Sequence, residues 1–264
     1  MDLDGHGARN TSTSTIPGRR VTYWWLSQFF DVKAFLTAIH ALPSYIRSFR
    51  AFRKLSGEEL RWRETIPRLL DSTPSSPFDP HYFYLSAWAM KHIDMSPDTL
   101  HVDIGGPVNL AACMASRRPT AFLDYRPLDA DLAELYSIGG DLLQLPFRDR
   151  SLESLSCLHV VEHVGLGRYG DALDPEGTRK ACRELERTLA PGGVLLIALP
   201  VGRPGVHFNA HRIHSPAQVI HMMPDLRLVE FSLVDDRGRF SEKAPLVHGD
   251  RQKYGCGLFR FTRD

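Results

Sequence analysis

A short apolar segment that runs into an acidic residue and then into two glycines constrains this chain more than any other feature. The segment is His101-Val102-Asp103-Ile104, and Gly105-Gly106-Pro107 follows it directly. Glycines at a strand-to-helix turn let backbone N–H groups approach a ligand, and the positive end of the helix predicted at 110–116 points to the same place. This order predicts a site for a nucleotide-type cofactor. A third glycine is missing, because Asn109 stands there, so a tight turn without a ligand remains the alternative.

The chain is long enough, at 264 residues, for one large α/β domain and a helical extension. Residues 1–20 are polar and rich in Gly, Ser and Thr, which predicts a flexible tail. Residues 21–80 predict a helical extension and a linker, and residues 81–264 predict the main domain. The helices expected in the extension are 23–42, which stops before Pro43, then 43–55 and 57–70.

Beyond residue 81, apolar strands alternate with helical segments, which predicts a mostly parallel, Rossmann-like α/β sheet covered on both faces. Helices are expected to open near residues 110, 175 and 215. A polar loop instead of a helix separates the last two strands, so we expect them to pair antiparallel at a sheet edge. The expected strands are 100–104, 121–124, 136–139, 155–160, 194–198, 228–234 and 257–261.

Three acidic residues fall at the ends of successive predicted strands. Asp103 ends the first strand, Asp124 ends the second, and Asp141 follows the third. The carboxyl ends of such strands form the ligand crevice of an open α/β sheet. We therefore expect the three to converge around one nucleoside, with Asp124 accepting hydrogen bonds from the ribose hydroxyls and Asp141 near the adenine. The alternative is that each is an ordinary turn or cap aspartate.

Composition limits the classes of partner and compartment. A formal charge of +1 gives no global field to gather nucleic acid, so a small-molecule ligand is expected instead. The four cysteines are scattered without zinc-finger spacing and predict reduced, mostly buried thiols. Residues 1–20 lack the apolar core of a secretory signal, and charges and Pro43 interrupt 21–46, so we expect a cytoplasmic protein without a membrane span.

Basic residues outnumber acidic ones between residues 47 and 68. Such a helix face either rests weakly on an anionic membrane surface or is simply solvated.

Histidines and a carboxylate gather where the fourth and fifth predicted strands end. Glu162 beside a histidine is a plausible acid–base unit, and the alternative is that these histidines only hydrogen-bond the backbone. The expected catalytic residues are His159, Glu162, His163 and His211.

We further expect the loops 165–174 and 202–215 to form opposite walls of an acceptor pocket. Arg168 and Arg212 would clamp a phosphate or carboxylate, and Tyr169 offers a flat face to a ring. The expected substrate-binding residues are His81, Tyr82 and Tyr84 as a lid, with Arg168, Tyr169, Asp171, Asn209 and Arg212. A divalent ion held by Asp171, Asp174, Glu162 and His163 stays open as an alternative, but their spacing matches no specific metal motif and no metal ligand is assigned.

Taken together, residues 98–264 resemble a class I S-adenosylmethionine-dependent methyltransferase. Three further blocks carry the resemblance besides the glycine turn: Leu143-Gln144-Leu145-Pro146-Phe147, Ser151-Leu152-Glu153-Ser154-Leu155 and Leu189-Ala190-Pro191-Gly192-Gly193-Val194-Leu195-Leu196. The resemblance implies that Asp103, Gly105 and Gly106 contact the methionine part and ribose of the cofactor. It also implies that Asp124 holds the ribose, that Asp141 and Leu142 frame the adenine, and that His159 lies where cofactor and substrate meet.

A narrower resemblance is to the domain of unknown function 268 family. It rests on Pro80-His81-Tyr82-Phe83-Tyr84, His101-Val102-Asp103-Ile104-Gly105, Ser156-Cys157-Leu158-His159, Glu162-His163, Gly165-Leu166-Gly167-Arg168-Tyr169-Gly170-Asp171 and Phe208-Asn209-Ala210-His211-Arg212. That family implies a fold and a cofactor but not a reaction.

The activity expected from these features is methyl transfer from S-adenosylmethionine, with S-adenosylhomocysteine as product, to an oxygen of a small polar acceptor such as a sugar or glycan precursor. Two alternatives stay open: a cofactor-binding protein without turnover, and a membrane-surface module that uses residues 21–70. The acceptor and the oligomeric state are not predicted.

Overall fold

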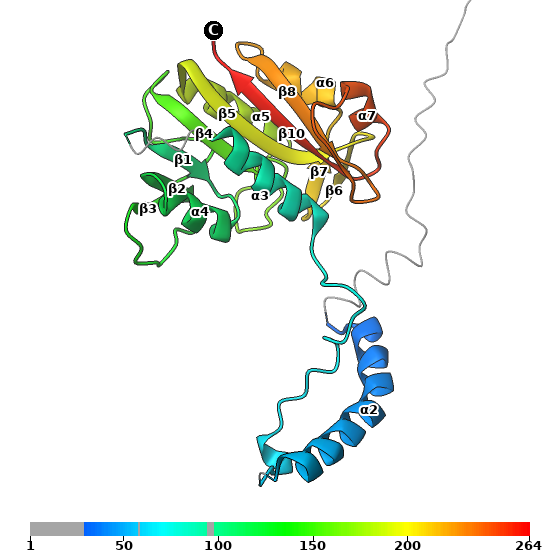
Figure 1. Ribbon diagram of the computed structural model, residues 1–264. Coiled ribbons are helices and arrows are strands. Elements are labelled where there is room, and N and C mark those ends of the chain that lie inside the picture. The colour runs from blue at the N-terminus through cyan, green and yellow to red at the C-terminus, as the bar shows by residue number, and fades with distance from the viewer. Residues whose placement is uncertain (1–28, 58, 94–97) are drawn as a thin grey trace, which may run out of the picture. The chain divides into compact units, whose positions relative to one another are not determined.

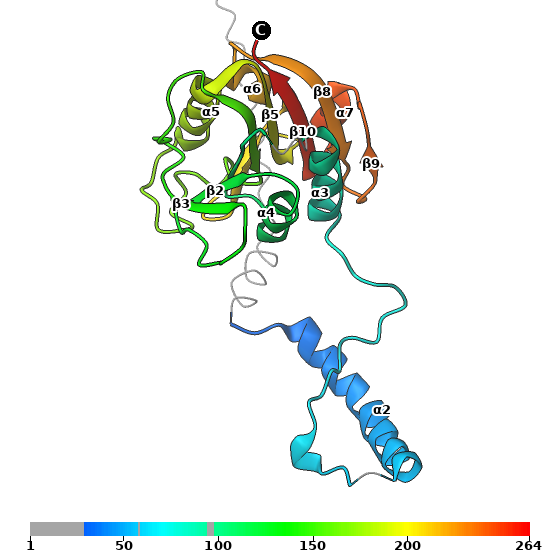
Figure 2. The same ribbon diagram turned by 60° about the vertical axis from the view of Figure 1, so that its left-hand side comes forward.

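The computed structural model describes residues 29–57, 59–93 and 98–264 (Figures 1 and 2). The chain divides into two compact units, Met1–Pro77 and Phe78–Asp264. The tail expected at residues 1–20 lies outside the described residues, as does the start of the helix expected at 23–42.

One long helix, α2 (Val32–Ser56), makes up most of the described part of the N-terminal unit. Asp31 caps its start, because its carboxylate accepts a 2.9 Å hydrogen bond from the Ala34 N–H. Gly57, with φ 67°, ends it in the left-handed conformation. The expected break at Pro43 is wrong. The proline ring sets a φ that suits a helix, and the helix continues with the loss of one N–H donor.

The helix expected at 57–70 is also wrong, because this segment holds only the short 3-10 turn η1 (Trp62–Glu64). Gly57 ends the preceding helix, and Pro67 disfavours a helical conformation for the residue before it. The Trp62 ring instead packs edge-on against Phe49 of α2, with ring centroids 5.4 Å apart. Within the described ranges, every helix is too short or too polar to cross a bilayer.

The described part of the C-terminal unit is built on an eight-stranded sheet in the order β3-β2-β1-β4-β5-β10-β8-β9. The strands β3, β2, β1, β4 and β5 are parallel to one another. The strands β10, β8 and β9 each pair antiparallel with their neighbours. The mostly parallel sheet is therefore confirmed. The strands are β1 (His101–Ile104), β2 (Thr120–Asp124), β3 (Leu135–Gly139), β4 (Leu152–Leu158), β5 (Leu189–Val201), β8 (Arg227–Val234), β9 (Phe240–Ser241) and β10 (Gly255–Thr262).

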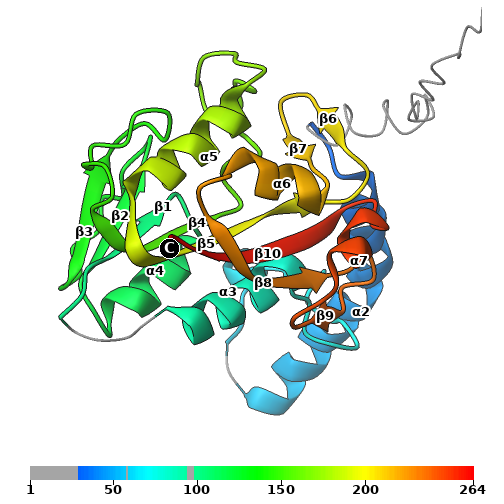
Figure 3. The same cartoon turned by 90° about the horizontal axis from the view of Figure 1, so that it is seen from above.

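Helices cover both faces of this sheet (Figure 3). Residues of β5 alternate between the two faces, so Ile197 packs into the core under α5 and α6, whereas Leu196 packs into the core under α3 and α4. Both side chains are almost fully buried. A sheet that is apolar on both faces needs such a three-layer arrangement. The helices are α3 (Pro80–His92), α4 (Val108–Ala115), α5 (Gly177–Thr188), α6 (Pro216–Met222) and the short α7 (Leu246–Asp250).

The last two long strands, β8 and β10, pair antiparallel on one side of the sheet, as expected. Strand β10 inserts between β5 and β8, and the two-residue strand β9 continues the sheet beyond β8. The insertion matters for function because it places Gly255 and Cys256, at the start of β10, beside the carboxyl end of β5.

Helix α3 and the strands β6 (Gly205–His207) and β7 (His211–Ile213), which lie near the site, were not predicted. Residues 80–92 form α3, so His81, Tyr82 and Tyr84 lie on a helix instead of on a mobile segment. Residues 205–213 form a hairpin of β6 and β7, separate from the main sheet. The strands β6 and β7 are only three residues long, so an alternating pattern in the sequence could not reveal them.

The different burial of two phenylalanines predicts how much each contributes to the free energy of unfolding. Phe259 of β10 is fully buried against Phe231 and Phe261, so Phe259→Ala should lower the free energy of unfolding by about 3–5 kcal/mol. Phe208 is 73% exposed, so Phe208→Ala should change it by less than about 0.5 kcal/mol. Urea denaturation measures both, and equal losses would contradict the assigned burial.

Candidate functional site

One open pocket lies at the carboxyl ends of the parallel strands, beside the point where the chain crosses from β1 to its neighbours β2 and β4. Its empty volume, counted out to open solvent, is about 740 Å³. The predicted site residues that line it are Gly105, Asp124, Asp141, Leu142, His159, His163, Tyr169 and Asp171.

Gly105 lines the pocket at the end of β1. Both its backbone conformation and its close neighbours disfavour a side chain at this position. Its φ is +58°, in the left-handed region, and a Cβ there would lie 3.1 Å from Asp124 Oδ2 and 3.3 Å from a methyl group of Val160. The missing side chain thus leaves space between the end of β1 and the carboxylate at the end of β2.

Asp124 and Asp141 both open into this pocket, as the sequence predicted. Asp124 Oδ1 accepts a 2.7 Å hydrogen bond from the Arg126 N–H, and Asp141 Oδ1 accepts a 2.8 Å bond from the Leu143 N–H. Each carboxylate therefore stabilises its own turn with one oxygen, so the turn role and the pocket role coexist. The other oxygen, Oδ2, makes no hydrogen bond to another described residue and remains free to accept one from a ligand.

Asp103 does not join them, and its predicted place against the cofactor is corrected here. Its side chain is completely buried and accepts a hydrogen bond from the Ser156 hydroxyl, which in turn contacts His101 Nε2 at 2.9 Å. Burial raises the pKa of Asp103 to about 7, although Ser156 and the Gly106 N–H favour the ionised form. Asp103 supports the glycine turn from behind the pocket.

Gly106 is part of the same arrangement. A Cβ at this position would lie 2.6 Å from Asp103 Oδ2, closer than any real side chain approaches. Gly106 is therefore glycine because of Asp103, and it is not among the residues that line the pocket.

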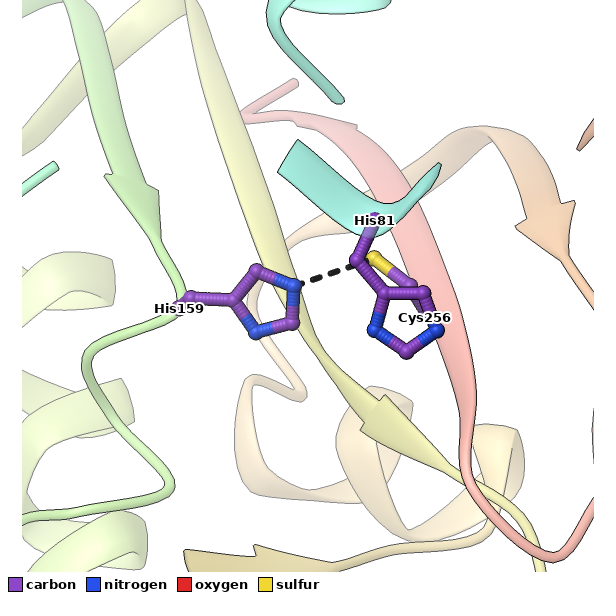
Figure 4. Close-up of side chains that lie close together, drawn as sticks. All are labelled: His81, His159 and Cys256. Carbon is purple, nitrogen blue, oxygen red and sulfur yellow. Dashed lines mark hydrogen bonds between the residues drawn. The ribbon is translucent and has the colours of Figure 1, made fainter. Parts of the chain in front are cut away.

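His159 and Glu162 form a buried pair directly after β4. The exposed fractions of their side chains are 5% and 1%, and His159 Nδ1 lies 2.8 Å from Glu162 Oε1. His159 Nε2 lies 3.3 Å from the Cys256 thiol of β10 (Figure 4). Burial lowers the pKa of His159, but Cys256 and Glu162 more than offset this and leave it well above its usual range.

His163 lines the pocket on the next turn of the same segment. Its Nδ1 lies 2.5 Å from the Ala210 carbonyl oxygen, and its Nε2 lies 3.7 Å from Glu162 Oε1. Burial lowers the pKa of His163 below 6.5, although Glu162 acts in the opposite direction. The ring is therefore neutral at pH 7 and able to accept a proton.

The loop after His163 is held by Asp171. The Asp171 carboxylate accepts hydrogen bonds from the N–H groups of Gly165, Gly167 and Tyr169, at 2.7, 3.3 and 3.2 Å. Burial would raise the pKa of Asp171, and these three donors more than offset it, so the pKa is lowered. Asp171 thus lines the pocket mainly as the organiser of its loop.

Two arginines contact the ring of Tyr169, and of these only Arg126 lines the pocket. The guanidinium carbons of Arg126 and Arg168 lie 4.5 and 5.2 Å from its ring centroid. Arg126 was not singled out from the sequence. Its position two residues after Asp124, past the end of β2, is a signal that could have found it.

Arg212, predicted to clamp the substrate, is a structural residue instead. It is buried, and its guanidinium donates to the carbonyl oxygens of Val164 and Asp174, at 2.5 and 2.9 Å, and to the Thr178 hydroxyl. Three of the five N–H donors of Arg212 are engaged in these bonds, and the residue is not among those that line the pocket.

Asn209, His211 and Tyr84 also lie outside the pocket lining, as do His81, Tyr82 and Arg168. Asn209 occupies the left-handed position of the β6–β7 turn, with φ 60°. The His211 ring packs against Tyr254, and burial together with His207 lowers its pKa to about 4. Tyr84 stacks on Phe240 of β9, away from the histidines.

His81, Tyr82 and Tyr84, which were expected to form a lid, lie on a helix. His81 and Tyr82 begin α3, and their rings pack against His159, with centroids 5.8 and 5.3 Å away. A helix in the core layer keeps them there.

Comparison with known proteins agrees with this architecture. Residues 148–244 match the model of the family described as "Caenorhabditis protein of unknown function, DUF268". A search of curated proteins found no sequence match. The chain is therefore similar to this family over the segment that contains His159, Glu162 and the 165–171 loop.

Solved structures share the fold. A complex of the Haloferax volcanii Trm112 methyltransferase activator with a candidate methyltransferase matches with a TM-score of 0.51 and 17% identity, over 69% of this chain and 90% of that chain. The [4+2]-cyclase SpnF matches with a TM-score of 0.50 and 15% identity, over 68% of this chain and 80% of that chain. The chain has the Rossmann-like fold of class I methyltransferases.

Asp103 makes the stability of the fold depend on pH. Its pKa rises from 3.8 to about 7 on folding, so its protonated form stabilises the fold fully below about pH 4. This contribution is lost as the pH rises through 7. Asn at this position cannot ionise. The free energy of unfolding of Asp103→Asn, relative to that of the wild type, should therefore rise by up to about 4 kcal/mol between pH 4 and pH 8.

Urea denaturation across this range measures the difference, with exposed Asp131→Asn as a control that should stay parallel to the wild type. A difference that is constant with pH for Asp103→Asn would contradict the buried protonated carboxyl.

Proposed function

We propose that this chain, which resembles the DUF268 family and has the class I methyltransferase fold, is an S-adenosylmethionine-dependent methyltransferase. The observation that carries the proposal is that Gly105, Asp124 and Asp141 open on one pocket at the carboxyl ends of parallel strands. Two carboxylates and a glycine turn in that position suit an adenosine, because they provide acceptors for ribose hydroxyls and for an adenine amino group.

The residues of the pocket fit the cofactor. The glycine turn leaves room for the methionine part, Asp124 Oδ2 is free to accept from the ribose, and buried Leu142 with Val160 provides apolar walls for the adenine. When bound, S-adenosylmethionine supplies an electrophilic methyl group, so the protein needs chiefly to align a nucleophile and to remove its proton.

We assign proton removal to His163. It lines the pocket, its pKa is lowered by burial so that the ring is neutral near pH 7, and Ala210 orients it. Glu162 lies behind both histidines and acts as a positioning residue. His211, which lies outside the pocket, has no role in this proposal.

A histidine base favours a hydroxyl acceptor, so the proposed reaction is methylation at oxygen. Tyr169 offers a flat face to a ring, and Arg126 and Arg168 beside it favour an acceptor with an anionic or strongly polar group. A small polar molecule such as a sugar or glycan precursor has both features. Labelled methyl transfer to a metabolite extract, followed by mass spectrometry of the product, tests this acceptor class.

A cofactor-binding protein without methyl transfer is the second candidate. The likeness to the [4+2]-cyclase SpnF favours it, because that protein is named for a cyclization and not for methyl transfer. The same fold is therefore not restricted to methyl transfer. Binding of S-adenosylmethionine with no transfer to any component of the extract would support it over the first proposal.

Asp124 is expected to contribute directly to cofactor affinity. Asp124→Asn should weaken binding of S-adenosylhomocysteine about 10- to 100-fold, because a hydrogen bond to a charged acceptor contributes about 1.5–3 kcal/mol. Isothermal titration calorimetry measures the dissociation constant. Asp131→Asn, on the exposed segment after β2, is the matched control and should bind as the wild type does. Equal affinity of all three proteins would remove Asp124 from the cofactor site.

His163 is expected to affect turnover and not cofactor binding. His163→Ala should reduce kcat at least about 100-fold, the usual contribution of a general base, while the affinity for S-adenosylhomocysteine changes only a few fold. In the wild type, kcat should fall on the acid side with an apparent pKa below 6.5, because protonation blocks the base. Exposed His207→Gln serves as the control, and full turnover by His163→Ala would exclude the assigned role.

A further inference from the structure

Three potential metal ligands from distant parts of the chain meet next to the pocket (Figure 4). They are His81 from the first turn of α3, His159 from the segment after β4, and Cys256 from the start of β10. One ligand atom of each lies within 4.8 Å of the other two. In Figure 4 a ring nitrogen of His81 is on the side that faces His159, and His159 Nε2 is directed to the Cys256 sulfur.

We infer that His81, His159 and Cys256 form a binding site for a thiophilic divalent cation, with Zn²⁺ as the ion that fits best. Two imidazoles and one thiolate are a donor set that Zn²⁺ prefers, and three protein ligands leave a fourth position for water. The inference does not depend on the methyltransferase activity.

The spacing of the cluster is close to that of a bound ion. In a tetrahedral site, Zn–S of about 2.3 Å and Zn–N of about 2.0 Å place sulfur and nitrogen about 3.5 Å apart. The measured distance from Cys256 Sγ to His159 Nε2 is 3.3 Å. The widest separation in the cluster is at most 4.8 Å, so an ion would draw its members together by only about 1 Å.

The ligand backbones are fixed before any ion binds. The His159 N–H donates to the Ala198 carbonyl oxygen at 2.8 Å, and its φ of 58° turns the side chain out of the strand direction. Cys256 is paired on both sides, with β5 and with β8. The His81 N–H donates to the Asp79 carboxylate at 2.8 Å. Little ordering entropy is therefore lost on binding.

Glu162 completes the site from behind. Its Oε1 lies 2.8 Å from His159 Nδ1, so when an ion replaces the Nε2 proton it would hold the tautomer whose Nε2 lone pair faces Cys256. Its Oε2 is buried without a hydrogen-bond partner among the described residues. A divalent cation would be balanced by this carboxylate and by the thiolate that Cys256 becomes when it binds the ion.

Burial also distinguishes an ion site from a nucleophilic thiol. Cys256 is 0% exposed, so a substrate carbon cannot reach its sulfur, whereas an ion needs only a position between the three side chains. The rings of Tyr82 and Tyr254 pack against His159 and His81 and shield the cluster. The sequence could not show this site, because residues 81, 159 and 256 have no metal-motif spacing.

Cobalt titration of the full-length, chelator-treated protein tests the inference. The wild type should take up one Co²⁺ per chain with a sulfur-to-cobalt charge-transfer band, and Zn²⁺ should displace it. Cys256→Ser should abolish the band, and His81→Gln should weaken binding. Glu162→Gln should keep the band but lower the affinity about 10- to 100-fold.

Two control variants separate this site from other ligands in the chain. Cys113→Ser removes an exposed thiol, and His92→Gln removes one member of the separate His92, Glu230 and Glu242 group. Both should bind Co²⁺ as the wild type does. Circular dichroism shows whether each variant is folded. Binding without the charge-transfer band, an unchanged band in Cys256→Ser, or no uptake by the wild type at an excess of either ion would overturn the inference.

Discussion

The arrangement of the site depends on the contacts that the buried carboxylate of Glu162 makes with two histidines. This side chain is 1% exposed, it bonds to His159, and it lies 3.7 Å from His163. The Glu162 carbonyl oxygen also accepts a hydrogen bond from the Arg212 N–H of the β6–β7 hairpin. An ionised carboxylate in the protein interior is costly unless cationic or donor groups surround it, so the histidines cannot move away from it independently. Glu162 thus positions two histidines through its side chain and the β6–β7 hairpin through its backbone carbonyl.

The topology of the sheet brings these groups together. Parallel strands β1, β2 and β4 end at one edge, and the polar residues that follow them, Asp124 and His159, share one pocket as a result. The antiparallel strand β10 then returns beside β5 and places Cys256 next to His159. The same fold edge therefore carries both a small-molecule pocket and, by our inference, a cation site, with His159 common to the two.

Much of the fold could be predicted from local patterns. The strands that surround the site, the helices that open near residues 110, 175 and 215, and the antiparallel pairing of β8 with β10 all follow from the alternation of apolar segments and turn residues. In the site, Asp124, Asp141 and Gly105 could be located because strand ends can be read from sequence. Asp103 and Arg212 could not be judged in the same way. Both are polar residues next to a functional segment, and only their burial shows that they hold backbone instead of ligand.

The sequence by itself determined which residues end the parallel strands, because strand and turn preferences act over a few neighbouring residues. It also determined that the turn after β1 needs glycine. Tertiary structure alone decided that β10 lies inside the sheet and that His81, His159 and Cys256 meet. Those outcomes depend on packing between segments up to 175 positions apart, from His81 to Cys256, and such contacts leave no periodic trace in the chain.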